Sequence, residues 1–398
     1  MANRPLHAVM GLDPGRLTDL LSDALEGTGP ALLPLDPDTP PPRLARILAT
    51  MRPAALRTPE GTTALADPAP TAEDVAVTIA TSGSTGAPKG VELTASALTA
   101  SVRASLARIG ARPADPWLCL LPPAHISGLL VLVRALATGA RPIHARFDPD
   151  TAMAAARRHR PHVSLVPTQL HRLLAAGADL SAFNTILLGG AAAPEGLLAA
   201  ARSAGATVVT TYGMSETSGG CVYDGRPLEG VRTRLDDDGR ILLAGPTLFH
   251  GYRLDPAATA AHTRTDPDGT RWFTTSDLGT LDSDGRLRVR GRLDDVINTG
   301  GHKVVAGDVA ALLLDMDSVS DAVVVGRPDP EWGQRVTAVV VPADPAAPPE
   351  LAEVRDHVRR HLPAYAAPRE LDVRAALPLL ASGKPDLVAL RGAPAARD

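Results

Sequence analysis

Short apolar runs, separated by stretches with helical spacing, limit the fold of this chain more than any other feature. The runs have the length of buried strands, and the alanine-rich segments between them, such as 95–108, have the spacing of helices. Strands that alternate with helices form parallel sheets with helices on both faces. We therefore predict an α/β fold with strands at 75–80, 117–121, 141–144, 163–166, 185–188 and 206–210.

The pattern changes after about residue 230. Turns that carry Asp and Gly join short apolar runs at 235–241 and 281–287, and such turns are typical of β-hairpins. Beyond Gly291 the sequence predicts a compact α+β segment. Its helices are expected at 304–316 and 351–361, and its strands at 322–325 and 336–341.

These patterns predict two domains. The first, 1–293, has α/β layers and a β-rich subdomain, and the second, 294–398, is a small α+β domain. Residues 1–70 are rich in Pro and Asp and are expected to form a loosely built start of the first domain, with helical patches such as 17–25.

Composition excludes several classes of function. The chain has 398 residues and a net charge of −4, so no broad basic surface is indicated and nucleic-acid binding is not expected. Cys119 and Cys221 lie too far apart for a disulfide framework or a metal site, and Cys119 is expected to be a buried apolar residue. We find no signal-peptide pattern and no apolar stretch near the ~18 residues that span a bilayer. A soluble cytoplasmic protein without membrane insertion is therefore expected.

The strongest local signal is a loop rich in hydroxyl groups and glycine, directly after the strand predicted at 75–80. It reads Thr81-Ser82-Gly83-Ser84-Thr85-Gly86-Ala87-Pro88-Lys89-Gly90. Its glycines allow close approach to a ligand, and its hydroxyls, backbone N–H groups and lysine can surround nucleotide phosphates. The spacing differs from that of a Walker A loop. The alternative is a flexible Ser/Gly turn, which the preceding strand and the Pro-Lys-Gly sequence disfavour.

Four further motifs follow this loop in order. They read Thr211-Tyr212-Gly213-Met214-Ser215-Glu216-Thr217, Trp272-Phe273-Thr274-Thr275-Ser276-Asp277-Leu278-Gly279, Gly291-Arg292-Leu293-Asp294-Asp295-Val296-Ile297 with Gly300-Gly301-His302-Lys303-Val304, and Ser382-Gly383-Lys384. The series resembles the adenylate-forming superfamily of acyl-CoA and aryl-CoA ligases, luciferases and peptide-synthetase adenylation domains. The resemblance covers about residues 75–390. It implies an AMP-forming acid–thiol ligase with a mobile C-terminal domain, which uses ATP, Mg²⁺ and coenzyme A.

The resemblance also implies roles for single residues. Tyr212 would stack on adenine, Ser215 would touch the α-phosphate, Glu216 would hold Mg²⁺, and Asp277 with Arg292 would bind the ribose. The other nucleotide-binding candidates are Thr81, Ser82, Gly83, Ser84, Thr85, Gly86, Lys89, Gly189, Gly190, Ala191, Thr211 and Gly213.

Two candidates concern catalysis and movement. Lys384 would stabilise the charge that develops at the α-phosphate, and Asp294 would be the hinge of the small domain. Taken singly, such residues are more often solvated charges or turn residues, and only the ordered series favours function. Two departures are present: Ser276 replaces a usual glycine, and Lys384 lacks flanking basic residues.

The segment 122–129 is the clue to the acid. It reads Pro-Pro-Ala-His-Ile-Ser-Gly-Leu and resembles the acyl-pocket segment of the o-succinylbenzoate–CoA ligases of menaquinone biosynthesis, in their compact actinobacterial form. The resemblance implies that His125, Ser127 and Gly128 line the pocket and that His125 takes part in catalysis. A second substrate carboxylate would need donors, for which His125, Ser127 and Arg134 are candidates. Alternatively, His125 closes the site as a neutral ring.

Three other functions remain open. The chain could activate another aryl or acyl acid, it could load a carrier-protein thiol, or it could be a non-catalytic nucleotide-binding relative. Intact Glu216, Asp277, Arg292 and Lys384 argue against the last of these. The expected partners are thus a small carboxylic acid, ATP and CoA, and the sequence leaves a homodimer open.

Overall fold

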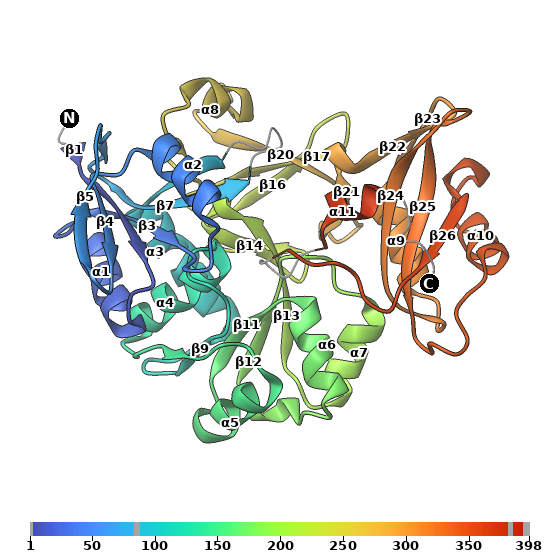
Figure 1. Cartoon of the computed structure of the whole chain (residues 1–398), viewed down its shortest axis with the longest axis horizontal. Coiled ribbons are helices and arrows are strands. Elements are labelled where there is room, and N and C mark those ends of the chain that lie inside the picture. Colours follow the sequence, from blue (N-terminus) through green and yellow to red (C-terminus); the bar gives the residue numbers. More distant parts are fainter. Residues whose placement is uncertain (1–2, 83–87, 381–384, 393–398) are drawn as a thin grey trace. The chain divides into compact units, whose positions relative to one another are not determined.

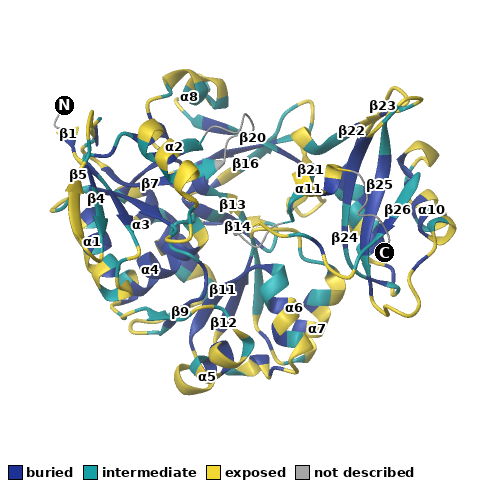
Figure 2. Cartoon of the chain, viewed as in Figure 1, coloured by how far each residue is buried: buried dark blue, intermediate teal, exposed yellow. Residues whose placement is uncertain are grey.

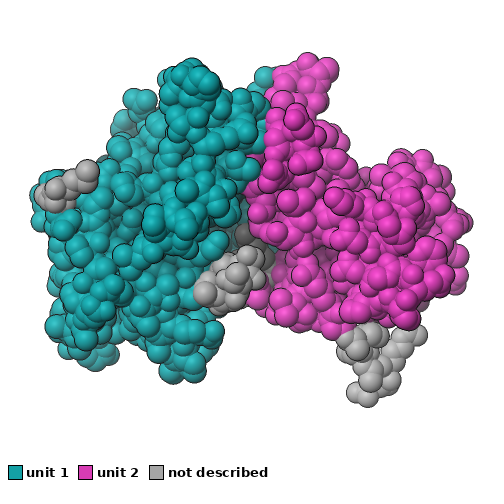
Figure 3. Space-filling model, turned by 90° about the horizontal axis from the view of Figure 1, so that it is seen from above, with its two compact units in different colours: residues 1–190, 201–234, 242–274 teal, residues 191–200, 235–241, 275–398 magenta. Residues whose placement is uncertain are grey.

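The structure is a computed structural model, and it describes residues 3–82, 88–380 and 385–392. The chain divides into two compact units, which Figure 3 shows in different colours. The first unit contains residues 1–190, 201–234 and 242–274, and the second contains residues 191–200, 235–241 and 275–398.

The strands that flank the predicted phosphate loop belong to a seven-stranded sheet of the first unit (Figure 1). Its strand order is β18-β8-β7-β3-β2-β4-β5. The bounds are β2 Leu6–Met10, β3 Ala31–Leu35, β4 Ala55–Thr58, β5 Gly61–Ala64, β7 Val75–Ser82, β8 Pro88–Thr94 and β18 Gly251–Tyr252. Strand β2 runs parallel to β3 and β4, whereas β7 and β8 are antiparallel.

The expectation of a loosely built first 70 residues is wrong. Besides β2 to β5, this region contains α1 Pro14–Glu26 and α2 Pro41–Met51, together with β1 Asn3–Arg4, which pairs with β6 Thr71–Ala72. Helix α1 begins where the Asp13 side chain accepts the N–H of Gly15, and it ends at Gly27 with φ +78°. The short buried strands β2 and β3 show too little periodicity to stand out among the proline-rich loops.

A second seven-stranded sheet lies in the same unit, with the order β10-β9-β11-β12-β13-β14-β15. The bounds are β9 Trp117–Cys119, β10 Ile143–His144, β11 His162–Leu165, β12 Thr185–Leu188, β13 Val208–Met214, β14 Gly219–Tyr223 and β15 Arg226–Pro227. The first five strands are parallel, and β14 is antiparallel to β13. The predicted α/β fold is confirmed, and Figure 2 shows β11 and β12 as buried strands of this sheet.

Helices connect and separate the sheets. The bounds are α3 Ala95–Ile109, α4 Ile126–Thr138, α5 Pro149–His159, α6 Pro167–Ala175, α7 Glu195–Ser203 and the 3₁₀ turn η1 Leu180–Ala182. Helix α3 packs against β7 and β8 of one sheet and β14 of the other, so it forms part of the layer between the two sheets. Cys119 and Cys221 are both free and buried, as expected for Cys119.

Both predicted hairpins form. The strands are β16 Arg232–Leu235, β17 Arg240–Ala244, β19 Thr263–Thr265, β20 Arg271–Leu281 and β21 Leu287–Arg292, and α8 covers Pro256–His262. Asp236 and Asp282 begin the two turns, and in each turn the aspartate side chain accepts a backbone N–H four residues later.

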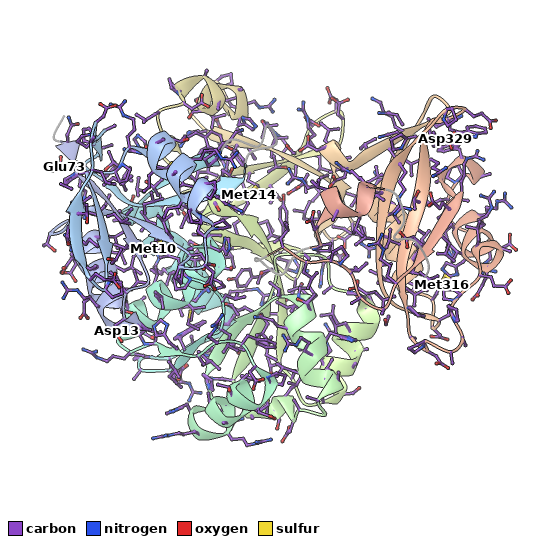
Figure 4. All side chains as sticks on the ribbon, viewed as in Figure 1. Met10, Asp13, Glu73, Met214, Met316 and Asp329 are labelled. Carbon is purple, nitrogen blue, oxygen red and sulfur yellow. The ribbon has the colours of Figure 1, made fainter. Side chains whose placement is uncertain are left out.

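The C-terminal segment has the predicted α+β structure. After the 3₁₀ turn η3 Leu293–Asp295 come β22 Val296–Thr299, β23 His302–Val305, α9 Ala306–Leu314, β24 Val319–Asp329, β25 Gly333–Pro342, α10 Leu351–Arg359, the 3₁₀ turn η4 Ala364–Ala366, β26 Glu370–Val373 and α11 Leu387–Arg391. The sheet order is β23-β22-β25-β24, and β26 pairs with β25. Met316, labelled in Figure 4, belongs to its core. The boundary proposed at Asp294 lies between β21 and β22 and stays a prediction.

Within the described ranges, no helix has both the length and the apolar character needed to cross a membrane.

Candidate active site

The central motif begins on β13 and continues into the 3₁₀ turn η2, Ser215–Thr217. Met214, labelled in Figure 4, is the last residue of β13, and its N–H donates to Oγ1 of Thr217 over 2.9 Å. The N–H of Phe249 donates to the carbonyl oxygen of Glu216 over 2.8 Å. Strand β13 is parallel to β12 but antiparallel to β14, so the motif lies at the carboxyl end of a strand where the sheet changes direction. Ligands of α/β sheets bind outside such strand ends.

The adenine candidates lie at the ends of neighbouring strands. Gly189 follows β12, Tyr212 is near the end of β13, and Leu188 pairs with Thr210 between these strands. A Cβ atom at Gly189 would lie 2.3 Å from Oγ1 of Thr211, so only glycine permits this approach. At Gly213 a Cβ atom would lie 2.0 Å from the carbonyl oxygen of Gly219. Gly189 and Gly213 therefore each have a local steric reason.

Glu216 has a partner that sequence analysis missed. The hydroxyl of Tyr252 donates to Oε1 of Glu216 over 2.8 Å. Lys89 Nζ lies 5.2 Å from the centroid of the Tyr252 ring. Burial, and then the negative charge of Glu216, raise the pKa of Tyr252 well above its ordinary value, so its hydroxyl remains a donor. No local pattern marks Tyr252, because its partners are distant in sequence.

The predicted phosphate loop joins two antiparallel strands. Thr81 and Ser82 end β7, Lys89 lies on β8, and the Thr81 hydroxyl donates to the carbonyl oxygen of Lys89 over 3.3 Å. A Walker A loop instead leads from a strand into a helix, so the geometry agrees with the sequence in excluding that motif. The candidates Gly83, Ser84, Thr85 and Gly86 lie outside the described residues.

The ribose candidates and the hinge candidate form a chain of ion pairs in the second unit. Asp277 on β20 pairs with Arg292 on β21 in the strand register. Arg292 Nη1 donates to Oδ1 of Asp277 over 3.2 Å, and Nη2 donates to Oδ2 of Asp294 over 3.1 Å. Burial alone would lower the pKa of Arg292, but the charges of these aspartates outweigh it and raise the pKa.

The acyl-pocket candidates lie at the start of α4. His125 is the N-cap residue, Ser127 is exposed in the first turn, and Gly128 is buried. A Cβ atom at Gly128 would lie 2.3 Å from the carbonyl oxygen of Pro122, so glycine is required where the helix meets the preceding segment.

Arg134 serves the interior and not the pocket. Its side chain is buried, Nε donates to Ser105 over 3.1 Å, and Nη2 donates to Tyr223 over 3.2 Å. Nη1 lies 3.5 Å from the Ser164 hydroxyl. Because its donors face protein hydroxyls, we do not retain Arg134 as a partner for a substrate carboxylate.

Comparison with known families agrees with this geometry. The sequence pattern of the AMP-binding enzyme family matches residues 54–253, and that of the AMP-binding enzyme C-terminal domain matches residues 308–384. The chain is also 44% identical, over 88% of its length, to the probable 2-succinylbenzoate–CoA ligase of Mycobacterium tuberculosis, of which 93% is covered. The chain belongs to the AMP-binding enzyme family.

Solved structures of this family have the same fold. One is the o-succinylbenzoate CoA synthetase of Bacillus subtilis in complex with its acyl-adenylate intermediate, with a TM-score of 0.81 and 26% identity over 98% of this chain and 88% of that chain. Another is the amide bond synthetase McbA of Marinactinospora thermotolerans, with a TM-score of 0.84 and 29% identity over 98% of this chain and 90% of that chain. The resemblance inferred from the motifs is confirmed.

Lys384 is the last residue of the match to the C-terminal domain of AMP-binding enzymes, and it lies outside the described residues. Backbone hydrogen bonds connect the described residues before Lys384 to those after it. Leu379 and Pro385 form an antiparallel bridge, and the N–H of Asp386 donates to the carbonyl oxygen of Pro378 over 2.8 Å. Asp386 then caps α11 through the N–H groups of Val388 and Ala389.

Glu216 suits a magnesium ion that arrives with the nucleotide. The described residues contain no cluster of three or more His, Cys, Asp or Glu side chains able to hold a metal. Mg²⁺ is commonly held by one or two carboxylates together with water and substrate phosphates. Oε1 of Glu216 accepts from Tyr252, and Oε2 has no hydrogen-bond partner within the described part of the chain. A single carboxylate with one such oxygen fits a Mg²⁺ ion whose other ligands are ATP phosphates and water.

Proposed function

We propose that this AMP-binding enzyme is a carboxylate–CoA ligase that activates 2-succinylbenzoate as its acyl-adenylate and transfers the acyl group to coenzyme A. The observation that carries this proposal is the 44% identity to a probable 2-succinylbenzoate–CoA ligase over 88% of this chain and 93% of that protein. Membership of the family supports the ligase reaction, and the similarity to this relative supports 2-succinylbenzoate as the acid that is activated. It also supports a role in menaquinone biosynthesis.

The nucleotide binds through residues of several strand ends. Tyr212 stacks on one face of adenine, while Gly189, Gly190 and Ala191 form the opposite wall. A Cβ at Gly189 would meet Thr211, so the glycine permits the close approach of the ends of β12 and β13 from which these residues come. Asp277 accepts hydrogen bonds from the ribose hydroxyls, and Arg292, already 3.2 Å from it, holds the carboxylate in place.

The phosphates meet donors from three segments. In this proposal the loop Thr81–Gly86 and the cation of Lys89 would bind the β- and γ-phosphates, and Ser215 would contact the α-phosphate. Glu216 would hold Mg²⁺ through its carboxylate, and the bound ion would neutralise phosphate charge.

The first half-reaction forms the acyl-adenylate. A carboxylate oxygen of the acid attacks the α-phosphorus of ATP, a new P–O bond forms, and the bond to pyrophosphate breaks. Lys384, which lies outside the described residues, would stabilise the transition state with its positive charge between the carboxylate and the α-phosphate. In the second half-reaction the small domain turns about Asp294, the CoA thiolate attacks the acyl carbon, and AMP leaves with the electrons of the mixed-anhydride bond.

The acid lies against the start of α4. A buried carboxylate without hydrogen-bond donors is costly, so the second carboxylate of the acid needs partners. We assign this role to His125 and Ser127. The N-terminal end of a helix also favours a negative charge, and α4 has no side-chain cap among the described residues. The required glycine at position 128 allows this helix end to approach the segment before it.

The experiment that tests this function is pyrophosphate release with Mg·ATP, CoA and a panel of acids. The panel contains 2-succinylbenzoate, benzoate, salicylate, a cinnamate and a medium-chain fatty acid. We expect strong turnover with 2-succinylbenzoate alone. Turnover with a different acid would keep the ligase and reject the pathway, and no turnover with any acid would favour a carrier-protein acceptor or a non-catalytic relative.

Replacing Lys384 separates the two half-reactions. We expect Lys384→Ala to lower adenylate formation by at least about 100-fold, as when other transition-state donors are removed, and to spare thioester formation from preformed acyl-adenylate. Each half-reaction is measured alone, the first by pyrophosphate exchange and the second by release of AMP. Equal loss of both would contradict the role assigned to Lys384.

A further inference from the structure

Glu216 is held at both its main chain and its side chain by one short segment, 249–252. The N–H of Phe249 donates to the Glu216 carbonyl oxygen over 2.8 Å. The Tyr252 hydroxyl donates to Oε1 of its carboxylate, also over 2.8 Å. These two bonds join the turn after β13 to β18, which belongs to the other seven-stranded sheet. The orientation of the Glu216 carboxylate therefore depends on a residue of a different sheet.

Tyr252 is itself fixed on several sides. It is 7% exposed, its N–H donates to Oγ1 of Thr259 over 2.8 Å, and it pairs with Val91 across β18 and β8. Its ring packs edge-on against Phe249 at 5.0 Å and against His262 at 5.6 Å between centroids. With the ring and backbone both held, the hydroxyl has little freedom and can serve as a rigid donor.

The same ring also contacts the cation of the phosphate loop. Lys89 lies two residues before Val91 on β8, so both side chains are on the face that Tyr252 meets. Lys89 Nζ is 5.2 Å from the ring centroid. Tyr252 thus lies between an acid assigned to the metal and a lysine assigned to the phosphates.

We propose that Tyr252 is a positioning residue, whose hydroxyl holds Oε1 of Glu216 so that the other carboxylate oxygen is presented to the magnesium ion of Mg·ATP. This inference rests on the proposed function, because that function assigns the metal to Glu216. Hydrogen-bond partners of metal ligands orient those ligands, and their loss commonly costs about 10- to 100-fold in metal affinity or activity. Tyr252 does not itself need to touch the nucleotide.

The test is calorimetric titration of the full chain with ATP, at a series of Mg²⁺ concentrations and in EDTA. Tyr252→Phe retains the ring, with its packing and its contact to Lys89, and removes only the hydroxyl. We expect this variant to need about 10- to 100-fold more Mg²⁺ to tighten ATP binding. Its affinity for ATP in EDTA is expected to stay within about twofold of the wild-type value, because the hydroxyl acts only through the metal ligand.

Tyr223→Phe is the matched control. Tyr223 is also a buried tyrosine of the first unit, but its hydroxyl bonds to Ser105 and Arg134 and not to Glu216. We expect this variant to lose thermal stability while its Mg²⁺ requirement stays at the wild-type level. An equal change in the Mg²⁺ requirement of both tyrosine variants would overturn the proposal, since it would indicate a general effect on folding.

Glu216→Gln separates this inference from the function on which it rests. If Glu216→Gln raises the Mg²⁺ requirement and Tyr252→Phe does not, the positioning role is wrong and the metal ligand stands. If Glu216→Gln leaves the Mg²⁺ requirement unchanged, the metal assignment fails and the positioning role fails with it. A raised requirement in both variants, with normal ATP binding in EDTA, supports the proposal.

Discussion

Arg253 in the first unit and Arg292 in the second both pair with carboxylates, but their surroundings differ. The Arg253 side chain is 1% exposed and that of its partner Glu92 is 11% exposed. The Arg292 side chain is 52% exposed, and so is that of Asp294, one of its two partners. The first pair is part of the interior, and the second stands at the surface.

The donors of Arg253 are all directed at protein acceptors. Nη1 donates to Glu92 over 2.9 Å, Nε donates to the carbonyl oxygen of Met51 over 2.5 Å, and Nη2 donates to that of Ala69. These bonds join the end of α2 to β8 and β18. A cation satisfied in this way holds the fold together and has no donor to offer a ligand.

Arg292 is arranged differently, because two carboxylates share it and water reaches it. Its pair with Asp294 is exposed on both sides and contributes only about 0–1 kcal/mol, so Arg292 can lose that partner at little cost in free energy. The proposed hinge role of Asp294 requires such a weak pair. The two arginines differ in that Arg253 is enclosed together with its carboxylate, whereas Arg292 connects a buried carboxylate, Asp277, to an exposed one, Asp294.

The largest effect is expected at the buried pair. Arg253→Met leaves Glu92 buried without its cation, and we expect the free energy of unfolding to fall by about 3–5 kcal/mol. Urea unfolding followed by circular dichroism measures this change. The double variant Arg253→Met with Glu92→Leu is expected to recover part of the lost stability. A loss below about 1 kcal/mol in Arg253→Met alone would contradict a structural role for this buried pair.

Asp277→Asn should affect the ligand more than the fold. The ribose hydroxyls lose a charged acceptor, and hydrogen bonds to charged groups contribute about 1.5–3 kcal/mol, so we expect ATP affinity to fall by about 10- to 100-fold. The Asp277 side chain is only 10% exposed, but Arg292 is half exposed and keeps its pair with Asp294, so we expect a smaller loss of unfolding free energy than in Arg253→Met. Calorimetric binding and urea unfolding of the same sample measure both quantities, and a mainly destabilised variant with normal affinity would contradict this division.

The His162–Asp115 pair adds a test of burial, because His162 is buried like Arg253 but, unlike an arginine, can lose its positive charge near neutral pH. Nε2 of His162 lies 3.1 Å from Asp115, and the His162 side chain is 2% exposed. Burial, opposed by Asp115 and assisted by the charge of Arg134, lowers the pKa of His162 from the ordinary 6.5. The unfolded chain therefore binds the proton more readily, and stability should fall as the pH drops below about 6.5.

Unfolding midpoints in urea, measured from pH 8 to pH 5, test this dependence. Asp115→Asn removes a charge that raises the pKa of His162, so the pKa falls further and the loss of stability at low pH becomes larger. A smaller loss in Asp115→Asn than in the wild type would contradict this account, since it would mean that Asp115 does not raise the pKa of His162.

The smallest effect is expected at the exposed pair Arg359–Asp356 on α10. The two side chains are 45% and 70% exposed, and their closest atoms lie 3.8 Å apart. Arg359→Ala should change the free energy of unfolding by no more than about 0.5 kcal/mol and leave ATP affinity unchanged. A larger loss, measured in the same urea experiment, would mean that exposure alone does not distinguish the two kinds of charge.

The sequence predicted much of the fold because its signals are local. The run at 185–188 is the strand β12 itself, the segment 95–108 lies within α3, and the turns at Asp236 and Asp282 form hairpins. Length, apolar content and turn chemistry suffice for such elements. In the first 70 residues the helical patch at 17–25 lies within α1, but the strands were missed, because five-residue strands between proline-rich loops carry almost no periodicity.

By itself, the sequence determined the family, the order of the motifs and the residue types offered to the nucleotide, since these depend on short contiguous patterns. Only the tertiary structure decided which charges are structural and which are available. Glu216 and Tyr252 meet although 36 positions separate them, and Arg134 turned out to face interior hydroxyls. The physical reason is that exposure and hydrogen-bond partners are properties of packed surfaces, and segments far apart in the chain create them together.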